Sequence, residues 1–131
     1  MTSQAQPSGA RDHRAYVVGD IHGRLDLLDR LLGAIHAELE ARPARRSVLV
    51  FVGDLIDRGP DSAGVVERLR NYRHPRVKPI FLLGNHEEVM LRVLAGDSTL
   101  IGKWRQFGGL ECMARYGADP AHAWDFTWFF Q

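Results

Sequence analysis

The amino-acid sequence predicts an α/β fold in which a layered, mostly parallel sheet carries flanking helices. Three short apolar runs are each followed by a glycine-framed polar motif, and segments with apolar residues at three- and four-residue spacing lie between them. This alternation of strand and helix patterns is typical of parallel sheets. At 131 residues, 45% hydrophobic and 25% charged, the chain has the size and balance of one globular domain.

The first strand and helix are expected on either side of a motif at 19–23. Residues 15–18 form a short apolar run that predicts a buried strand. From about Arg24 to Glu40 the apolar residues mark one face of an amphipathic helix, which the Pro43 region ends. The residues expected to be buried on this face are Leu25, Leu28, Leu31, Leu32, Ile35 and Leu39.

The second strand is predicted at 48–52, where β-branched and aromatic residues follow one another. After the next motif, Asp61 or Ser62 is suited to cap a short helix because its side-chain oxygen can accept a free N–H of the first turn. This helix is expected to bury Val65, Val66 and Leu69.

The third strand is predicted at 77–83. Because proline has no N–H to donate, Pro79 disfavours strand pairing at the beginning of this segment and leaves the strand pattern of 80–83 intact. A helix from about 87 to 95 follows the last motif. Its inward residues are expected to be Val89, Met90, Val93 and Leu94.

The two ends of the chain differ from this pattern. Residues 1–14 are polar, lack the apolar core of a signal peptide, and are expected to form a disordered tail before a domain at 15–119. Glycines such as Gly108 and Gly109 predict short, broken helices late in that domain. Residues 120–131 form an atypical tail, because the last eight positions hold five of the chain's twelve aromatic residues.

Charge and cysteine content narrow the function classes. The net charge of +1 gives no reason to expect broad binding to nucleic acid or membrane surfaces. Cys112 is the only cysteine and is expected to be a core residue, so no internal disulfide can form. No apolar run approaches the roughly 20 residues that cross a bilayer. These features predict a cytoplasmic protein.

The three glycine-framed motifs carry the chemistry. They read GDIHG at 19–23, GDLIDRG at 53–59 and GNHE at 84–87, and each follows a predicted strand. The carboxyl ends of parallel strands share one edge of a sheet, where loops converge on ligands. Oxygen and nitrogen ligands without cysteine favour Mn²⁺, with Fe or Zn²⁺ as alternatives. The candidate ligands are Asp20, His22, Asp54 and Asn85.

The remaining polar residues of the motifs suit phosphate chemistry. Two metal ions about 3.5–4 Å apart can activate a water and clamp the oxygens of an in-line displacement at phosphorus. Arg58 offers a permanently charged fork to phosphate oxygens. His86 is the candidate proton donor to the leaving alcohol, and Asp57 the carboxylate that orients its imidazole. By contrast, His13, His36 and His74 are expected to be solvated.

These motifs resemble the signature of the metal-dependent phosphoprotein phosphatase family, within the calcineurin-like metallophosphoesterase superfamily. The family pattern is GD-x-HG, GD-x-x-DRG and GNHE. The later Trp104, Gly108-Gly109 and Tyr116-Gly117 are spaced as in the bacterial serine/threonine phosphatases. The resemblance covers about residues 16–119. It implies a metallophosphoesterase-type sheet, of which this chain would supply the N-terminal half, and a hydrolase acting on a phosphorylated protein or a small phosphoester.

The resemblance implies a role for each candidate ligand. Asp20 and His22 would bind the first of two divalent metal ions. Asp54 would bridge both ions, and Asn85 would bind the second.

It also implies the groups that handle the substrate. Arg58 would hold the phosphate, while His86 and Asp57 would form the acid pair. In this reading a metal-activated water attacks phosphorus in line with the leaving alcohol.

The sequence departs from the family at its C-terminus. Family members continue further and add two histidines to the second metal and another phosphate-binding arginine. Only His122 follows the third motif at any distance here, and it comes after a turn-like segment rather than an apolar strand. It is not expected to replace a missing ligand. A C-terminally truncated or frame-shifted chain is therefore expected.

Two other functions stay open. One is a catalytically impaired remnant that binds one metal or a phosphorylated partner. The other is a nucleotide hydrolase similar to the symmetrical diadenosine tetraphosphatases, a related branch. That branch lacks the aspartate before the arginine of the second motif and has aspartate after the histidine of the third. Asp57 and Glu87 favour the protein-phosphatase branch. The oligomeric state is left open.

Overall fold

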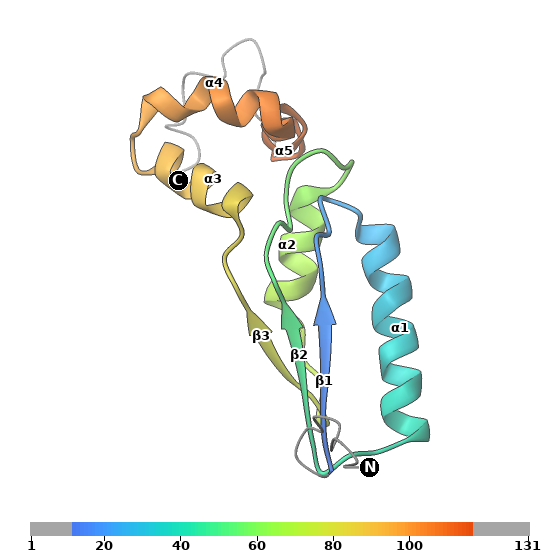
Figure 1. The fold of residues 1–131 in the computed structure, drawn as a ribbon. Helices are drawn as coiled ribbons and strands as arrows, with labels where there is room; N and C mark the ends of the chain where they lie inside the picture. Colours follow the sequence, from blue (N-terminus) through green and yellow to red (C-terminus); the bar gives the residue numbers. More distant parts are fainter. Residues whose placement is uncertain (1–11, 117–131) are drawn as a thin grey trace, which may run out of the picture.

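The computed structural model describes residues 12–116 and confirms an α/β fold with a parallel sheet (Figure 1). Most of the expected N-terminal tail, the aromatic tail and His122 lie outside the described residues. The elements are β1 (His13–Val18), α1 (Leu25–Ala41), β2 (Arg46–Phe51), α2 (Ser62–Arg70), β3 (Lys78–Phe81), α3 (Asn85–Leu94), η1 (Ser98–Leu100), α4 (Ile101–Trp104), η2 (Arg105–Gly109) and α5 (Leu110–Arg115).

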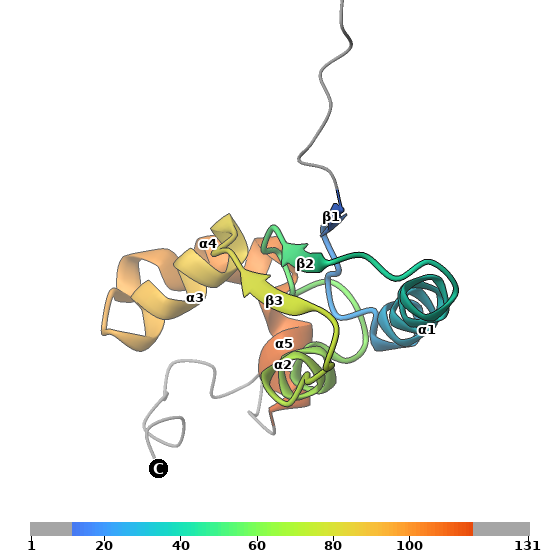
Figure 2. The same cartoon turned by 90° about the horizontal axis from the view of Figure 1, so that it is seen from below.

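The three strands lie side by side in the order β1-β2-β3, and both pairs are parallel. Val18 pairs with Phe51, and Phe51 with Phe81, so the strands reach the same edge together. Viewed along the strands, α1 and α2 lie on one face of the sheet (Figure 2). All three motifs therefore leave the sheet at its carboxyl edge, as the sequence predicts.

An apolar core, the sheet cluster, fills the space between the sheet and these two helices. Alternate residues of β2 and every third or fourth residue of α1 point into it, as the strand and helix periods require. Its buried members are Val18, Ile21, Leu28, Leu32, Ile35, Leu39, Leu49, Phe51, Val65, Leu69, Tyr72 and Val77. The prediction for Leu31 is wrong, because this residue lies at the margin of the apolar stripe and its side chain is 41% exposed.

A second core, the helical cluster, lies beyond the carboxyl edge, where α3, α4 and α5 gather (Figure 1). The glycines break this region as predicted: Gly108 has a φ of 94°, which ends one helical segment before the next begins. The buried members of the helical cluster are Ile56, Val93, Ile101, Trp104, Cys112 and Met113.

The third strand and its helix differ in detail from their predictions. Pro79 lies inside β3, which ends at Phe81, whereas Leu82 and Leu83 are exposed in the loop. Proline fits there because β3 is the edge strand of the described sheet. Helix α3 starts at Asn85, two residues earlier than predicted, so GNHE forms its first turn. Leu94 is only partly buried.

The predictions of solvated side chains for His36 and His74 are wrong. His36 Nε2 lies 2.9 Å from the Tyr72 hydroxyl oxygen, and its ring stacks on His74 with 4.5 Å between centroids. Burial lowers the pKa of His36, and the neighbouring His74 and Arg68 lower it further. The partners come from α2 and the loop behind it, which helix periodicity alone cannot reveal.

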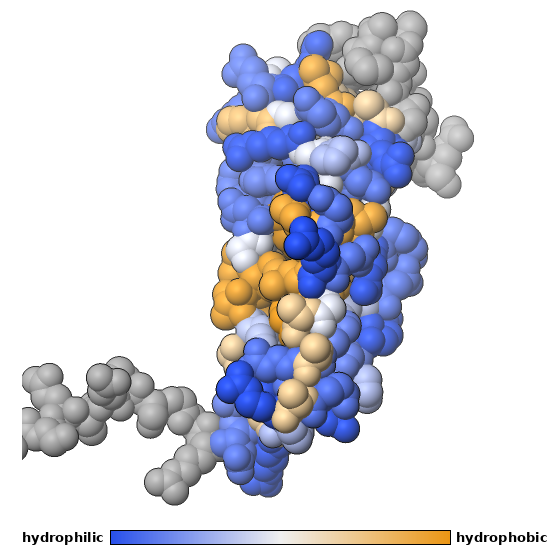
Figure 3. Space-filling model, turned by 90° about the vertical axis from the view of Figure 1, so that its right-hand side faces the viewer, coloured by the Kyte–Doolittle hydropathy of each residue, from blue (hydrophilic) through white to orange (hydrophobic). Residues whose placement is uncertain are grey.

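Some apolar side chains remain on the surface of the described part. Figure 3 shows apolar surface on the side that carries α1, where Leu27 and Leu31 are exposed. On β1 and β3, Val17 and Ile80 also face solvent. Within residues 12–116 no helix has the length and apolarity needed to span a membrane.

Candidate metal and phosphate site

The loops that carry the first two motifs are held together by backbone hydrogen bonds at the carboxyl edge of the sheet. The N–H groups of Ile21 and His22 both donate to the carbonyl oxygen of Asp54, at 3.0 and 2.9 Å. The next residue, Gly23, donates its N–H to the carbonyl oxygen of Leu55 at 2.8 Å. The residues predicted to bind metal on the first two motifs thus belong to one rigid unit.

Backbone strain concentrates in this unit. Five described residues other than glycine have a positive φ, and all but one are predicted site residues. The four are His22 (44°), Asp54 (52°), Asp57 (71°) and Arg58 (66°). Such conformations are unfavourable for residues with a Cβ and persist where the surroundings enforce them, most often at functional sites.

The third motif meets the second by close backbone approach. A Cβ on Gly53, whose φ is 101°, would lie 2.2 Å from Gly84 N, so a larger residue cannot be accommodated there. Glu87, which is buried, completes the joint. Its carboxylate accepts the N–H groups of Asp54 (2.7 Å), Leu55 (2.7 Å) and Gly84 (3.0 Å). One side chain therefore fixes the relative position of two motifs.

Three side chains converge where the motifs meet. Potential ligand atoms of His22, Asp54 and His86 all lie within 4.8 Å of one another. The Asp20 carboxylate lies 3.6 Å from His22 Nε2 and is exposed. Asn85 is exposed on the first turn of α3, directly before His86, whose backbone N–H donates to Asp54 Oδ1 at 3.1 Å.

The donor set fits a divalent metal ion. His22 Nδ1 is 2.8 Å from the carbonyl oxygen of Ile56, which can only accept, so Nδ1 carries the proton and Nε2 keeps its lone pair. This lone pair faces Asp20, and the Asp54 carboxylate lies within the same cluster. Imidazole nitrogen with carboxylate oxygens suits Mn²⁺, Fe or Zn²⁺.

Asp57 and His86 form a buried pair beside this cluster. Asp57 Oδ2 lies 2.7 Å from His86 Nδ1, and their side chains are 0% and 3% exposed. Burial raises the pKa of Asp57, and the hydrogen bonds from His86 and Trp104 oppose that rise. With Nδ1 directed at the carboxylate, Nε2 is the atom of His86 that remains for the site.

Arg58 supplies the positive charge of the site. Its side chain is exposed, and Nη1 donates to His22 Nε2 at 3.3 Å. This contact agrees with an unprotonated Nε2 and places the guanidinium beside the three-residue cluster. A planar, permanently charged group at that position can bind two oxygens of a phosphate.

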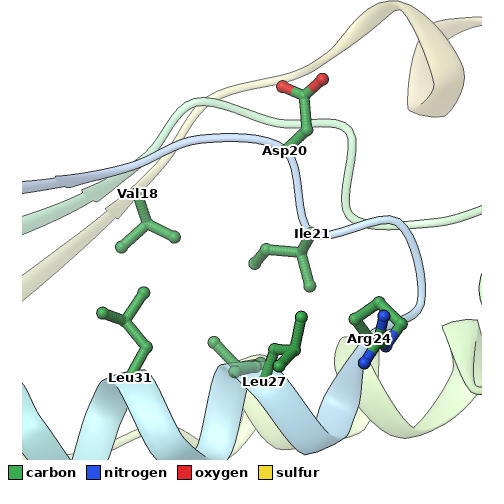
Figure 4. A pocket seen from close by; sticks show the side chains of 7 residues that line it. Val18, Asp20, Ile21, Arg24, Leu27 and Leu31 are labelled. Atoms are coloured by element: carbon green, nitrogen blue, oxygen red, sulfur yellow. The ribbon is translucent and has the colours of Figure 1, made fainter.

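A hollow of about 90 Å³ lies next to Asp20 but is a different feature. Val18, Ile21, Leu27 and Leu28 line most of it, between β1 and α1. Figure 4 shows the Asp20 carboxylate pointing away from these apolar side chains. Arg24 also lines the hollow, but its guanidinium is paired with Asp26 at 2.7 Å. The hollow is therefore mainly apolar, and Asp20 belongs to the motif loops.

Sequence reasoning gave no structural role to two residues that shape the site. In the sequence, Glu87 only distinguishes two family branches, yet its carboxylate accepts backbone N–H groups of two motifs. Trp104 stands out in the sequence only by its spacing, yet its indole N–H donates to the Asp57 carboxylate. The spacing of Trp104 before Gly108-Gly109 was a signal, but nothing local links it to a residue 47 positions earlier.

Comparison with known proteins bears on this site. The sequence model of the calcineurin-like phosphoesterase family matches residues 13–130. The symmetrical bis(5'-nucleosyl)-tetraphosphatase of Legionella pneumophila (strain Corby) is 43% identical over 81 residues, which are 62% of this chain and 26% of that protein. Serine/threonine-protein phosphatase 1 of Salmonella typhimurium (strain LT2) is 39% identical over 94 residues, or 72% of this chain and 38% of that one. The chain thus spans about a quarter to two fifths of these relatives.

Proposed function

The chain belongs to the calcineurin-like phosphoesterase family, and we propose that it carries the metal-binding and proton-donating part of a phosphoester hydrolase. The observation that carries this proposal is the cluster of His22, Asp54 and His86, whose ligand atoms lie within 4.8 Å of one another. Phosphomonoesters of serine or threonine are the proposed substrates. They are supported by Asp57, which the tetraphosphatase-like pattern lacks.

Four residues are proposed as metal ligands. His22 Nε2 and Asp20 face each other at 3.6 Å, the Asp54 carboxylate belongs to the same cluster, and Asn85 starts α3 beside it. Two divalent ions, with Mn²⁺ favoured, would supply a water of lowered pKa and neutralise charge on the phosphate. Asp54 is the proposed shared ligand, because its loop contacts both neighbouring motifs.

His86 and Arg58 are proposed to act on the substrate. His86 is held through Nδ1 by Asp57, which leaves Nε2 to give a proton to the leaving alcohol oxygen. Arg58 lies at the surface beside the cluster, where its guanidinium can orient the phosphate.

A second candidate function is the hydrolysis of dinucleoside tetraphosphates. The observation that favours it is the 43% identity with the Legionella pneumophila tetraphosphatase, which exceeds the 39% found for the protein phosphatase. The two values cover different lengths, 81 and 94 residues. Identity alone therefore does not separate these substrates, and direct competition between them is required.

The proposed setting is the cytoplasm, with a phosphorylated protein or small phosphoester as partner and no nucleic acid or membrane. Cys112 is buried, and burial raises the pKa of its thiol to about 12. A buried free thiol of this kind supports a reducing compartment and gives no support to a nucleophilic role.

Turnover experiments with Mn²⁺ test the proposal. A phosphoserine peptide, p-nitrophenyl phosphate and diadenosine tetraphosphate are offered separately to the chain. Release of phosphate from the first two supports the phosphomonoesterase, whereas cleavage of the dinucleotide alone favours the second candidate. Metal binding without turnover of any substrate would identify the impaired, metal-binding form and overturn the proposal.

Variants separate the two proposed roles. Asp54→Asn is expected to remove nearly all activity, because the shared ligand loses its charge. His86→Asn is expected to lower turnover about 10²- to 10⁴-fold, the range for loss of a general acid, while metal content measured by mass spectrometry stays unchanged. A loss of metal from His86→Asn would instead make His86 a ligand.

A further inference from the structure

The segment from Trp104 to Gly109 contains a motif that neither metal binding nor phosphate binding explains. It joins α4 to α5 and runs beneath the loop that holds Asp57 and Arg58. We propose that Trp104 is a positioning residue for the Asp57–His86 pair, acting through a hydrogen bond from its indole N–H to the Asp57 carboxylate. This inference rests on the proposed function, since that pair is the proposed acid.

The geometry places one donor across both carboxylate oxygens. Trp104 Nε1 lies 3.1 Å from Oδ1 and 3.0 Å from Oδ2 of Asp57. Oδ2 also receives His86 Nδ1 at 2.7 Å. The three residues form a hydrogen-bonded triad of indole, carboxylate and imidazole. The carboxylate cannot rotate freely without weakening a hydrogen bond to one of its two partners.

Because the triad is buried, each of its groups depends on the others for a hydrogen-bond partner. Trp104 and Asp57 are both 0% exposed, so water cannot replace either partner. A buried carboxylate without hydrogen bonds is strongly destabilised, and an indole nitrogen can only donate. Each group therefore satisfies a need of the other, and the direction of the Asp57 carboxylate follows from the position of the indole.

The rest of the segment supports the same loop. The Gly108 carbonyl oxygen accepts the backbone N–H of Arg58 at 3.2 Å, where Arg58 holds its positive φ. A Cβ on Gly108 would lie 2.6 Å from Arg58 N, so glycine allows this approach. Phe107 packs on the His86 ring with 5.4 Å between centroids. The segment thus contacts three proposed catalytic residues.

A purely packing role for Trp104 makes different predictions. Trp104 is a central member of the helical cluster, so any substitution there can lower stability. Packing alone, however, gives no reason for the indole N–H to affect how fast the His86 Nδ1–H proton exchanges. Trp104→Phe separates the two roles, because phenylalanine keeps an aromatic ring and removes only the donor and the second ring.

Tyr72→Phe is the matched control. Tyr72 is also a buried aromatic residue, and the substitution removes a hydrogen bond of 2.9 Å to His36 in the sheet cluster. It tests whether losing any buried aromatic donor disturbs the site. Tyr72 has no proposed role in metal binding or catalysis.

The primary experiment is nuclear magnetic resonance on the whole chain without metal. The His86 Nδ1–H proton is expected to exchange slowly in the native chain and in Tyr72→Phe. In Trp104→Phe its exchange is expected to accelerate at least about tenfold, as loss of one hydrogen bond to a charged group implies. Equal exchange in both variants would overturn the proposal, whatever the chain's activity.

A second measurement covers the case in which Trp104→Phe does not fold. The chain has three tryptophans, and the indole N–H of Trp104 can be followed directly in Asp57→Leu, which removes both acceptors. Its resonance is expected to shift and its deuterium exchange to accelerate. An unchanged indole resonance would contradict the hydrogen bond itself.

Turnover supplies a third readout once activity has been established. Trp104→Phe is expected to lower kcat about 10- to 100-fold with KM unchanged, because the substrate still binds and only proton donation suffers. A rise in KM with native kcat would overturn the positioning role. Complete absence of activity in the native chain would instead count against the proposed function, and leaves the resonance measurements to decide the present inference.

Discussion

The two apolar cores of this molecule support different kinds of structure. The sheet cluster lies between the sheet and α1 and α2, and its side chains come from regularly spaced positions in those elements. The helical cluster lies under the motif loops and includes Trp104, whose polar edge contacts Asp57. The first core holds the sheet and its two helices together, whereas the second also contacts the buried carboxylate of Asp57.

The two regions also differ in whether their buried polar side chains have hydrogen-bond partners. Around the helical cluster and the motifs, the buried polar side chains of Asp57, Ser62, His86 and Glu87 all have hydrogen-bond partners. In the sheet region, the buried Ser47 hydroxyl has no hydrogen-bond partner among the described residues. A fully partnered polar group resists substitution, and an unpartnered one does not. The buried polar side chains at the carboxyl edge should therefore tolerate substitution poorly, whereas Ser47 should tolerate the loss of its hydroxyl well.

The largest expected effect on stability comes from the sheet cluster. Leu32→Ala removes a side chain that is 1% exposed and leaves a cavity, which costs about 2–5 kcal/mol of unfolding free energy. Leu31→Ala, one residue along and 41% exposed, is the control and should cost under about 1 kcal/mol. Urea unfolding measures both. Equal costs would mean that α1 packs through a different face.

A smaller loss of unfolding free energy is expected where the second and third motifs meet. Glu87→Gln replaces a carboxylate oxygen by an amide donor that faces backbone N–H groups, at a cost of about 1–3 kcal/mol for an N–H left unpaired. The exposed neighbour permits the matched substitution Glu88→Gln, which should change stability little. The same urea experiment distinguishes the two, and equal stabilities would show that Glu87 does not clamp the loops.

The sequence predicted the sheet cluster far better than the site. Leu28, Leu32, Ile35 and Leu39 follow from helix periodicity, because their burial depends on spacing along one element. The convergence of the motifs follows from the parallel strand order. The hydrogen bond from Trp104 to Asp57 cannot be predicted in this way, because it depends on how the helices after β3 pack against the second motif.

The smallest expected effect on stability is at Ser47, and Ser62 is the serine to compare with it. Ser62→Ala removes the acceptor of Asp57 N–H at 3.0 Å and should cost about 1–3 kcal/mol. Ser47→Ala removes a buried hydroxyl without a described partner, so stability should stay constant or rise by up to about 1 kcal/mol. Thermal unfolding of the pair is the test. A larger loss for Ser47→Ala would reverse the contrast between the two regions.

The most direct test of the metal-binding edge is calorimetric titration of the chain with Mn²⁺. The native chain and Asp26→Asn, a substitution in an exposed ion pair on α1, should bind Mn²⁺ with equal affinity. Asp54→Asn should weaken that binding at least about tenfold, because the proposed shared carboxylate ligand loses its charge. Unchanged Mn²⁺ binding by Asp54→Asn, or no binding by the native chain, would contradict the assignment of this edge as the metal site.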